Sequence, residues 1–305
     1  IGELESVPGW DLKVVEFLRG DSAAQVIQAD GRQVTPPQGF EFALAKVFLR
    51  NTTLDEGSHS LGSLDLYLTG SNNRGYYDQI DGWPAPEFLY EDMFAAEAVE
   101  GWIDVVIPID ETDLMLILDL QSYSEPRITR YFELEPSASI VPSGSMFTQE
   151  VNALGVDLNQ PADIGQMMIL PEWDLTVIES LRGDAAMAML TQASPDFSGP
   201  DPGEEFILLN VMIHYFGSED LPISLNDNNF YVFTEDNRFN GRIRYPRSSG
   251  INWINSFIFP GAAVEGWVII ASPQGLQNPV IAFDPGEYLG TRDIAGEGVR
   301  YIRVP

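Results

Sequence analysis

Two histidines, His59 and His214, are the residues of this chain best suited to act as general bases or metal ligands near neutral pH. His59 lies in a Gly-Ser-His-Ser stretch that is expected to be an exposed loop, and His214 lies near the end of an expected strand. They occupy non-equivalent positions in the internal repeat, and the sequence contains no P-loop, GxSxG, HExxH or dinucleotide-binding fingerprint. The lack of cysteine excludes disulfides, thiolate metal sites and a cysteine nucleophile. We therefore predict no catalytic residues and no cofactor, and we expect a protein that is not an enzyme.

Carboxylates are the most abundant ionisable groups, with 46 acidic residues against 16 basic ones and a net charge of −30. Two carboxylates flanking a glycosidic bond can hydrolyse it, so a hydrolase acting on a cell-surface polymer through paired carboxylates is the alternative function. At this acid content chance pairs are expected, and no pair recurs in both copies of the repeat. The negative charge also predicts that nucleic acid is not a partner, because its binding depends on basic surfaces.

Oxygen-rich loops suggest a further chemistry, the binding of calcium. One candidate loop contains Asp227 and Asn228, and another contains Asp110 and Asp113. Neither has the spacing of a known calcium-binding loop, and the turns that asparagine and aspartate stabilise explain these residues equally well. These four residues are the candidate metal ligands.

The chemistry-bearing residues are distributed over two copies of one domain. Trp10-Asp-Leu, running on to Leu-Arg-Gly-Asp21, returns 163 residues later as the stretch from Trp173 to Asp184. Val-Glu-Gly-Trp at 99–102 returns at 264–267, and the offset grows slowly, as it does when only loop lengths differ. We predict copy one over residues 1–136, a partly packed linker over 137–163, and copy two over 164–305.

Each copy is predicted to consist of strands and one short helix. Asp21 is expected to be the N-cap of the helix in copy one, with Asp184 in the same role in copy two. Trp10 and Trp102 recur as Trp173 and Trp267, which indicates core positions rather than ligand contacts. The fold class is therefore predicted to be all-β, with two tandem immunoglobulin-like antiparallel β-sandwiches, each with one short helix. Strands are expected in copy one over residues 10–17, 40–48, 64–68, 100–107, 114–118 and 128–134.

The Trp10 strand, the central apolar strand ending at Asn51 and the strand carrying Glu100-Gly101-Trp102 resemble a family of immunoglobulin-like domains of unknown function. This family occurs in bacterial and archaeal lipoproteins and secreted proteins and is sometimes labelled after a telomeric repeat-binding factor. It is similar in fold to a secreted bacterial immunoprotective antigen. The resemblance covers residues 1–136 and 164–305. It implies an extracellular, non-catalytic protein and supplies no active-site residues.

One long loop in each copy is rich in aromatic residues, and the two loops have opposite charge. The acidic loop lies within 74–94, and its basic counterpart lies within 238–259. Aromatic residues and opposed charges are typical of protein interfaces, so the loops are candidate interaction surfaces, either between the copies or head-to-tail between molecules. Charge drift in loops of unequal length is the alternative. The candidate residues are Asp78, Asp81, Trp83, Glu87, Arg242, Arg244, Arg247 and Trp253.

No apolar run approaches the roughly 20 residues of a membrane-spanning helix, so no transmembrane span is expected. No signal peptide is recognised, which leaves open a leader or anchor upstream of the repeat. We predict an acidic, lipoprotein-like protein that is secreted or attached to the cell surface. Its expected role is a non-catalytic binding or structural module, with a protein, an envelope component or a second copy of itself as partner. A passive spacer in a cell-envelope layer is the alternative within this class.

Overall fold

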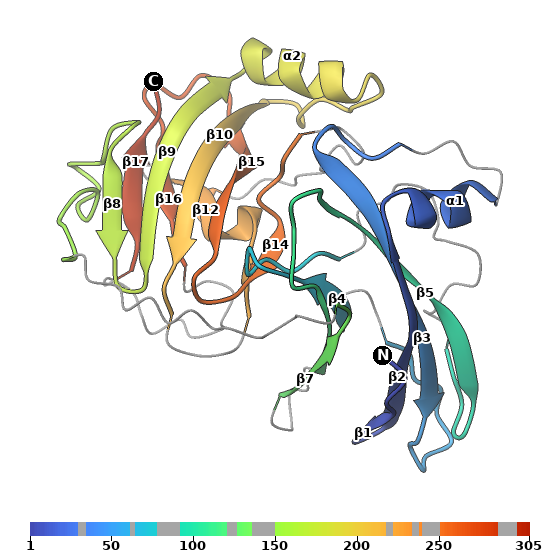
Figure 1. Ribbon diagram of the computed structural model, residues 1–305. Coiled ribbons are helices and arrows are strands. Elements are labelled where there is room, and N and C mark those ends of the chain that lie inside the picture. The colour runs from blue at the N-terminus through green and yellow to red at the C-terminus, as the bar shows by residue number, and fades with distance from the viewer. Residues whose placement is uncertain are drawn as a thin grey trace. The chain divides into compact units, whose positions relative to one another are not determined.

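The chain divides into two compact units, residues 1–141 and 142–305 (Figure 1). Antiparallel strands dominate both units, so the predicted all-β, sandwich-like fold is confirmed. The two short α-helices were also expected from the sequence. The computed structural model describes residues 1–29, 35–61, 65–77, 92–120, 127–135, 150–217, 222–233, 238–239, 251–285 and 298–305.

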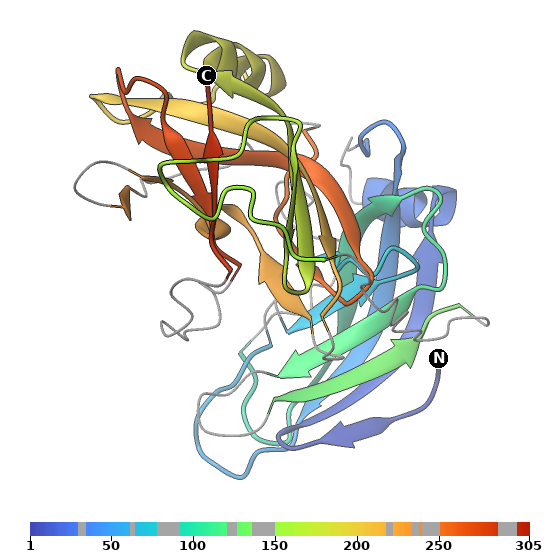
Figure 2. The same ribbon diagram turned by 90° about the vertical axis from the view of Figure 1, so that its left-hand side faces the viewer.

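Unit 1 contains two antiparallel sheets, seen from a second direction in Figure 2. The larger sheet has the order β1 (Glu5–Val7), β2 (Trp10–Arg19), β3 (Phe40–Asn51) and β5 (Ala98–Pro108). The smaller sheet has the order β4 (Leu66–Thr69), β6 (Met115–Leu120) and β7 (Ile128–Glu133). Strands β1 and β7 are therefore edge strands.

Unit 2 repeats this plan. Strands β8 and β17 are the edge strands that correspond to β1 and β7. The larger sheet has the order β15 (Ala263–Pro273), β10 (Glu204–Tyr215), β9 (Trp173–Arg182) and β8 (Met167–Leu170). The second sheet has the order β13 (Arg238–Phe239), β12 (Phe230–Phe233), β16 (Val280–Phe283) and β17 (Arg300–Arg303). A separate pair joins β11 (Ile223–Leu225) to β14 (Ser256–Ile258), and the 3₁₀ turn η1 (Asp227–Asn229) precedes β12.

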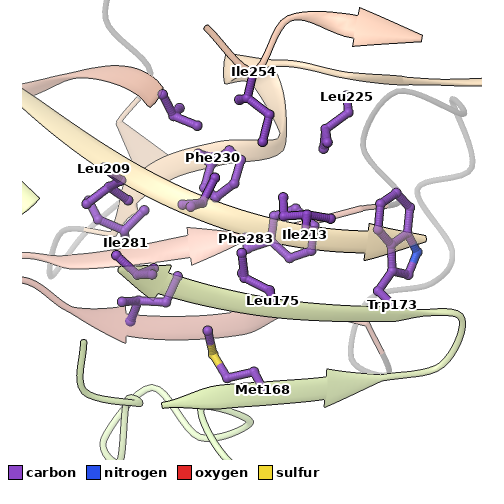
Figure 3. Packing of buried hydrophobic residues seen from close by; sticks show 14 of the residues in the cluster. Met168, Trp173, Leu175, Leu209, Ile213, Leu225, Phe230, Ile254, Ile281 and Phe283 are labelled. Carbon is purple, nitrogen blue, oxygen red and sulfur yellow. The ribbon is translucent and has the colours of Figure 1, made fainter. Parts of the chain in front are cut away.

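One face of each larger sheet packs into the main hydrophobic core of its unit. In unit 2, the Trp173 ring lies 4.6 Å from that of Tyr215 and 6.0 Å from that of Phe283, measured between centroids. Figure 3 shows Trp173 and Phe283 among the packed side chains of this core. Trp10 holds the same place in the core of unit 1. Burial of such aromatic side chains provides a large share of the hydrophobic stabilisation of a small domain. The predicted core positions of Trp10 and Trp173 are confirmed.

The opposite face of each larger sheet is covered by the helix of that unit. In unit 1, α1 (Asp21–Ala29) packs Ala23 and Ile27 against a cluster that includes Trp102. In unit 2, α2 (Asp184–Ala193) covers the corresponding cluster, on which Trp267 is only partly buried. Because both faces are covered, β3 and β10 are nearly continuous apolar strands rather than alternating ones. No helix in the described ranges is long and apolar enough to cross a membrane.

The predicted helix caps are wrong in one respect. Gly183 occupies the N-cap position of α2 with φ 54°, and no side chain caps this helix. Asp184 and its counterpart Asp21 are instead the first helical residues, where a carboxylate favours the positive end of the helix dipole. Gly20 is needed at the corner in unit 1, because it has φ 59° and an added Cβ would lie 2.9 Å from Glu41 Oε2.

Candidate functional site

The two histidines are held by carboxylates within their own units. His214 Nδ1 lies 2.6 Å from Asp174 Oδ1 across the β9–β10 ladder. His59 Nε2 lies 2.8 Å from Asp55 Oδ1 on an exposed turn, and its backbone pairs with that of Met93. Neither imidazole is next to a serine or to a second histidine in the contacts described. Both therefore stabilise local structure in this arrangement.

The candidate calcium ligands in unit 2 belong to a well-formed turn. Asn226 Oδ1 accepts a hydrogen bond of 2.8 Å from the Asn228 amide, and Asn229 Oδ1 accepts one of 2.9 Å from the Asn226 amide. This reciprocal cap fixes η1, and Asp227 is its first residue. Local turn chemistry thus explains this asparagine-rich stretch.

The candidate calcium ligands in unit 1, Asp110 and Asp113, flank a buried residue. Asp110 is exposed, and Asp113 is half-buried with φ 54°. Glu111 between them turns inward and is fully buried, so the three carboxylates do not converge. Across the parts of the chain that the structure describes, no group of three or more His, Asp or Glu side chains could hold a metal ion.

Most of the predicted interaction loops lie outside the described residues. This applies to Asp78, Asp81, Trp83, Glu87, Arg242, Arg244 and Arg247. Trp253 is described, and the segment around it runs along β15, where Trp267 N–H donates to Asn252 O at 2.7 Å. Gly266 permits this approach, since an added Cβ would lie 2.8 Å from Asn252 O. The Trp253 side chain is half-buried against the cluster beneath α2.

An arginine at the end of the second strand is used in the same way in both units. Arg19 donates to Glu41 Oε1 and Glu135 Oε1, each at 2.7 Å, and to the Glu111 carbonyl at 3.0 Å. Burial opposes the charge, but the hydrogen bonds to Glu135 and Glu41 raise the pKa of Arg19 overall. The guanidinium is therefore committed to joining strands, although an Arg-Gly-Asp tripeptide begins at this residue.

Its counterpart Arg182 repeats the contact with fewer partners. Arg182 donates to Glu205 Oε1 at 2.6 Å and to the Leu276 carbonyl at 2.5 Å. The repeat of both arginine and glutamate in the sequence could have revealed this ion pair in advance. A charge-assisted hydrogen bond of this kind is stronger than a neutral one.

A second polar pair is also repeated, with different chemistry. Asp11 on β2 lies opposite Arg50 on β3 and accepts from Arg50 Nε at 2.9 Å and from Ser6 Oγ at 2.6 Å. The hydrogen bonds from Ser6 and Arg50 hold the pKa of Asp11 below its usual range. The equivalent position in unit 2 is the Asp174–His214 pair, whose imidazole is charged only when protonated.

Two carboxylates among the described residues of unit 1, Glu111 and Asp119, are fully buried, and both accept hydrogen bonds from neighbouring segments. Glu111 accepts from Ser71 Oγ at 3.0 Å and from the Asn72 amide at 2.8 Å, and it also receives the Tyr76 hydroxyl. Burial and the adjacent Glu111 carboxylate raise the pKa of Tyr76, so its hydroxyl remains a donor. A buried acid with this many donors is held in place rather than free to transfer a proton.

Asp119 on β6 is the second of these buried carboxylates. It accepts from Arg127 Nε at 2.6 Å and from the Tyr67 hydroxyl at 3.1 Å. Burial and the nearby Asp119 charge raise the pKa of Tyr67. The ion pair ties β6 to the start of β7, because Arg127 immediately precedes that strand.

Glu204 is the acid with the most unusual environment in unit 2. Burial and the nearby Asp201 carboxylate raise its pKa. One of its carboxylate oxygens is buried without a hydrogen-bond partner among the described residues. Glu204 begins β10, and its amide donates to the Asp201 carbonyl at 2.9 Å. A carboxyl group with a raised pKa is the type of group that can act as a general acid.

The segment 150–163, here called the strap, closes one side of unit 2. Asn152 binds the outer edge of β8 in the manner of a strand residue. Its amide donates to the Ile169 carbonyl at 3.2 Å, its Oδ1 accepts from the Ile169 amide at 3.1 Å, and its Nδ2 donates to the Met167 carbonyl at 3.0 Å. The strap thereby covers an edge that would otherwise expose unpaired backbone groups (Figure 1).

The same strap pairs with the edge strand of the second sheet. Tyr301 N–H donates to the Gly155 carbonyl at 2.7 Å, and the Tyr301 carbonyl accepts from Ala162 N–H at 2.8 Å. Gly155 is required here, since it has φ 68° and an added Cβ would lie 2.6 Å from the Tyr301 carbonyl oxygen. The strap thus joins β8 to β17, the edges of two different sheets (Figure 2).

Arg300 on β17 lies beneath the strap and is 1% exposed. Its guanidinium donates to the Ile169 carbonyl at 3.1 Å and to the Asn152 carbonyl at 3.4 Å. Burial lowers the pKa of Arg300, and its Nε has no partner within the described ranges. The strap therefore encloses a buried cation that donates to backbone carbonyl groups, with no carboxylate among its described partners.

The corresponding side of unit 1 shows no such cover among the described residues. The side chain of Arg130, the counterpart of Arg300, is 44% exposed. Its Nε lies 3.3 Å from Oε1 of the equally exposed Glu5, with which it forms an ion pair. Phe132 is only partly buried, whereas its counterpart Ile302 is completely buried. No described segment forms a strand on the outer side of either β1 or β7.

The sequence did not predict the contacts of the strap or the difference between the edges of the two units. The apolar residues within 150–163 indicated partial packing of this stretch, but nothing in the sequence identified the strands on which it packs. Asn152 binds Ile169 on β8, whereas Gly155 binds Tyr301, which lies near the other end of unit 2 in the sequence. The roles of Asn152 and Gly155 become apparent only when the edge formed by β8 and β17 is compared with the equivalent edge of unit 1.

No known protein family matches the sequence, and no curated protein matches it. Among solved structures, a "putative lipoprotein" (ycdA) from Bacillus subtilis matches with a TM-score of 0.30 and 14% identity, over 44% of this chain and 39% of that one. The yjhA protein from Bacillus subtilis matches with a TM-score of 0.32 and 10% identity, over 47% of this chain and 98% of that one. The chain thus covers about two fifths of the lipoprotein's length. The immunoglobulin-like family assignment made from the sequence stays a prediction.

Proposed function

We propose that this chain is a non-catalytic binding and structural module of a secreted or surface-attached protein. The observation that supports the proposal is that its buried or half-buried charged side chains bind groups of their own unit. Arg19 and Arg182 join strands in equivalent ways, and Glu111 and Asp119 are saturated by donors from their own unit. Groups locked into a framework in this manner stabilise a scaffold, whereas a catalytic acid or base must be able to exchange its proton with a substrate.

The competing function is a hydrolase with paired carboxylates, and Glu204, whose pKa is raised by burial and by the nearby Asp201, is the acid to test for it. The test is to incubate the purified chain with peptidoglycan and with envelope polysaccharides from pH 4 to 8 and to measure released reducing ends. We expect no release above that of a heat-denatured sample. Release that disappears in the Glu204→Gln variant, but persists in Glu205→Gln, would establish the hydrolase and overturn the proposal.

We further propose that the charged aromatic loops support self-association of the module. The support is the opposite charge of residues 74–94 and 238–259 in the sequence. Charge reversal of Arg242, Arg244 and Arg247 to glutamate should lower the mass measured by light scattering at low salt. A matched reversal of Arg32, Arg292 and Arg303 controls for the change in net charge. Equal masses for all three proteins would show that the loops do not recognise each other.

A further inference from the structure

We propose that unit 2 binds a ligand that carries a primary alkylammonium group, the group at the end of a lysine side chain. The site lies on the helix side of the larger sheet and consists of Asn210, Glu265 and Trp267, here called the ammonium site. It rests on the proposed function only in treating unit 2 as a binding module. The observation that carries it is internal to the chain, because a lysine of the chain itself fills the equivalent position in unit 1.

Unit 1 shows how this face of the fold holds an ammonium group. Lys46 Nζ lies 3.0 Å from Glu100 Oε1 and 5.7 Å from the centroid of the Trp102 ring. Lys46 and Trp102 are direct partners in the ladder between β3 and β5. Glu100 lies two residues before Trp102 and therefore on the same face of the sheet. An ion pair and a cation–π contact thus act on one ammonium group.

Unit 2 keeps the acid and the indole of this arrangement but not the lysine. The repeated Val-Glu-Gly-Trp stretch places Glu265 and Trp267 where unit 1 has Glu100 and Trp102. Asn210 lies opposite Trp267 in the ladder between β10 and β15, which is the position of Lys46 in unit 1. An asparagine side chain is short and uncharged, so it supplies no cation to the acid and the ring.

The groups of the ammonium site are accessible in unit 2. Glu265 is exposed, and Trp267 is half-buried, whereas Trp102 beneath Lys46 is only 6% exposed. Within the described part of the chain, no basic side chain forms an ion pair with Glu265. Trp253 pairs with Trp267 and contributes a second half-buried indole to the same cluster. The acid and the ring are therefore available to a cation from outside.

Asn210 adds an acceptor to the site. Its Oδ1 is covered and has no hydrogen-bond donor among the described residues. A buried polar atom without a partner costs free energy, and the terminal amide of asparagine turns readily about χ2. The oxygen can therefore turn toward a bound ammonium group and accept a hydrogen bond that it otherwise lacks.

The charge of this face also favours a cation in unit 2. All three acids of the face in unit 1 are kept in unit 2, with Asp11, Glu16 and Glu100 matched by Asp174, Glu179 and Glu265. All three basic side chains are replaced, with Lys13, Lys46 and Arg50 matched by Thr176, Asn210 and His214. The face thus changes from balanced to acidic, which attracts a cation and disfavours an anion.

A primary ammonium group suits these residues better than a metal ion does. It can donate three hydrogen bonds, for which the Glu265 carboxylate and the Asn210 amide oxygen are acceptors. Its charge and alkyl stem suit the face of the Trp267 indole. Calcium requires six to eight oxygen ligands, and the described residues contain no group of three or more metal-binding side chains.

The experiment titrates the full chain with Nα-acetyl-lysine N-methylamide and follows the indole N–H signals by NMR. We expect saturable binding at one site, with a dissociation constant of about 1–10 mM, because one ion pair and one cation–π contact are formed. The norleucine analogue, which lacks the ammonium group, should not shift these signals. The trimethyl-lysine analogue should bind several-fold more weakly, because it cannot donate hydrogen bonds.

A parallel titration with butylammonium identifies the source of the ammonium group. Tighter binding of the lysine derivative would assign the site to a lysine side chain of a partner protein. Equal binding of the two probes would assign it to a free amine. Both results support the ammonium site.

Exchange of residues between the two units provides matched variants. Asn210→Lys should abolish binding and raise the melting temperature of unit 2, because the new side chain fills the site as Lys46 does in unit 1. Glu265→Gln should weaken binding about tenfold, whereas Asp196→Asn, which removes an exposed carboxylate after α2, should leave it unchanged. The double variant Lys13→Thr, Lys46→Asn should bind two ligands per chain, since it empties the equivalent position in unit 1.

Three results would overturn the proposal. They are the absence of binding, equal binding of the lysine derivative and its norleucine analogue, and unchanged binding by a folded Asn210→Lys chain. The comparison of the analogues uses the wild type, so it decides even where a variant does not fold. A negative result leaves the module function standing, because that function is judged by the separate assay of polymer hydrolysis.

Discussion

The two units share one architecture but complete it differently. In unit 2 the strap joins β8 to β17, and Ile302 and Arg300 become fully buried. In unit 1 the equivalent β7 is at most half-buried along its whole length. The described residues thus form the same sandwich core in both units, while the segment that covers this side is described only in unit 2. A covered strand edge has its backbone groups paired and is protected from pairing with another chain.

The two units also differ in the polar pair that joins β2 to β3 in unit 1 and β9 to β10 in unit 2. The position of the carboxylate is kept, Asp11 in unit 1 and Asp174 in unit 2, but its partner is arginine in one and histidine in the other. The register between β2 and β3 and that between β9 and β10 therefore place an acid and a base side by side in both units. The fold specifies the pairing, and the sequence of each copy sets its strength.

The strap provides the strongest test of this comparison. Gly155→Val should destabilise unit 2 by about 2–4 kcal/mol, because the new side chain would collide with Tyr301 and strain a backbone at positive φ. Unit 1 should be unaffected. Calorimetric melting of the full chain should resolve a transition that moves and one that does not.

Gly203→Val is the matched control for that experiment. Gly203 also has a positive φ, but an added Cβ would meet nothing within 4 Å. Its effect should therefore be limited to backbone strain of about 1–2 kcal/mol. Equal effects of the two substitutions would show that the strap does not stabilise unit 2.

Arg19 and Arg182, the arginines at the ends of β2 and β9, should contribute to stability in proportion to the number of their charged partners. Arg19→Gln should destabilise unit 1 by about 2 kcal/mol, because it loses charge-assisted bonds to two carboxylates. Arg182→Gln should cost unit 2 about 1 kcal/mol, since Glu205 is its one charged partner among the described residues. Denaturant midpoints of the two variants measure the difference. A larger loss for Arg182→Gln would contradict the ranking.

Asp11 should make the stability of unit 1 sensitive to acid. Its pKa is lower in the folded state than in the unfolded chain, so its contribution is present above the unfolded value and is lost as pH falls through the folded value. Below about pH 4, the wild type should therefore lose stability more steeply than Asp11→Asn. Melting temperatures from pH 2 to 6 test this. Parallel curves for the two proteins would show that the Ser6 and Arg50 contacts do not favour the charged form.

The smallest effect is expected at Glu204. A folded-state pKa that is raised means that unfolding becomes easier as pH rises from the unfolded value through the folded one. Glu204→Gln should remove this penalty and raise the melting temperature by about 1–2 °C at pH 7, with no gain at pH 3. Glu205→Gln, which removes the partner of Arg182, should lower the melting temperature instead.

The sequence predicted the main elements of the fold because its evidence was local or repeated. The recurrence of Trp10 as Trp173 indicated two copies with core tryptophans, and apolar runs marked β3 and β10. The helix caps were misassigned, because a corner that requires positive φ places glycine, not aspartate, before the helix. That requirement depends on how the strand meets the helix, which the local sequence does not record.

The candidate site was less predictable, because its contacts connect distant parts of the chain. Asn152 and Gly155 are ordinary residues whose roles depend on where β8 and β17 place their backbone groups. The candidate calcium ligands were chosen by composition, and in η1 the same asparagines satisfy the turn itself. The charged loops were chosen by comparing the two copies, and apart from Trp253 their candidate residues lie outside the described ranges.

The pairing of Gly155 and Ala162 with Tyr301 also determines when unit 2 can be completed during synthesis. The ribosome makes the strap about 140 residues before its partners on β17, which at 5–20 residues per second is an interval of roughly 7–28 s. Throughout that time the backbone groups of Gly155 and Ala162 remain without their final partners on β17. A nascent chain halted before Arg300 should therefore be more sensitive to protease in the strap than the finished chain, with release of the last strand as the step that protects it.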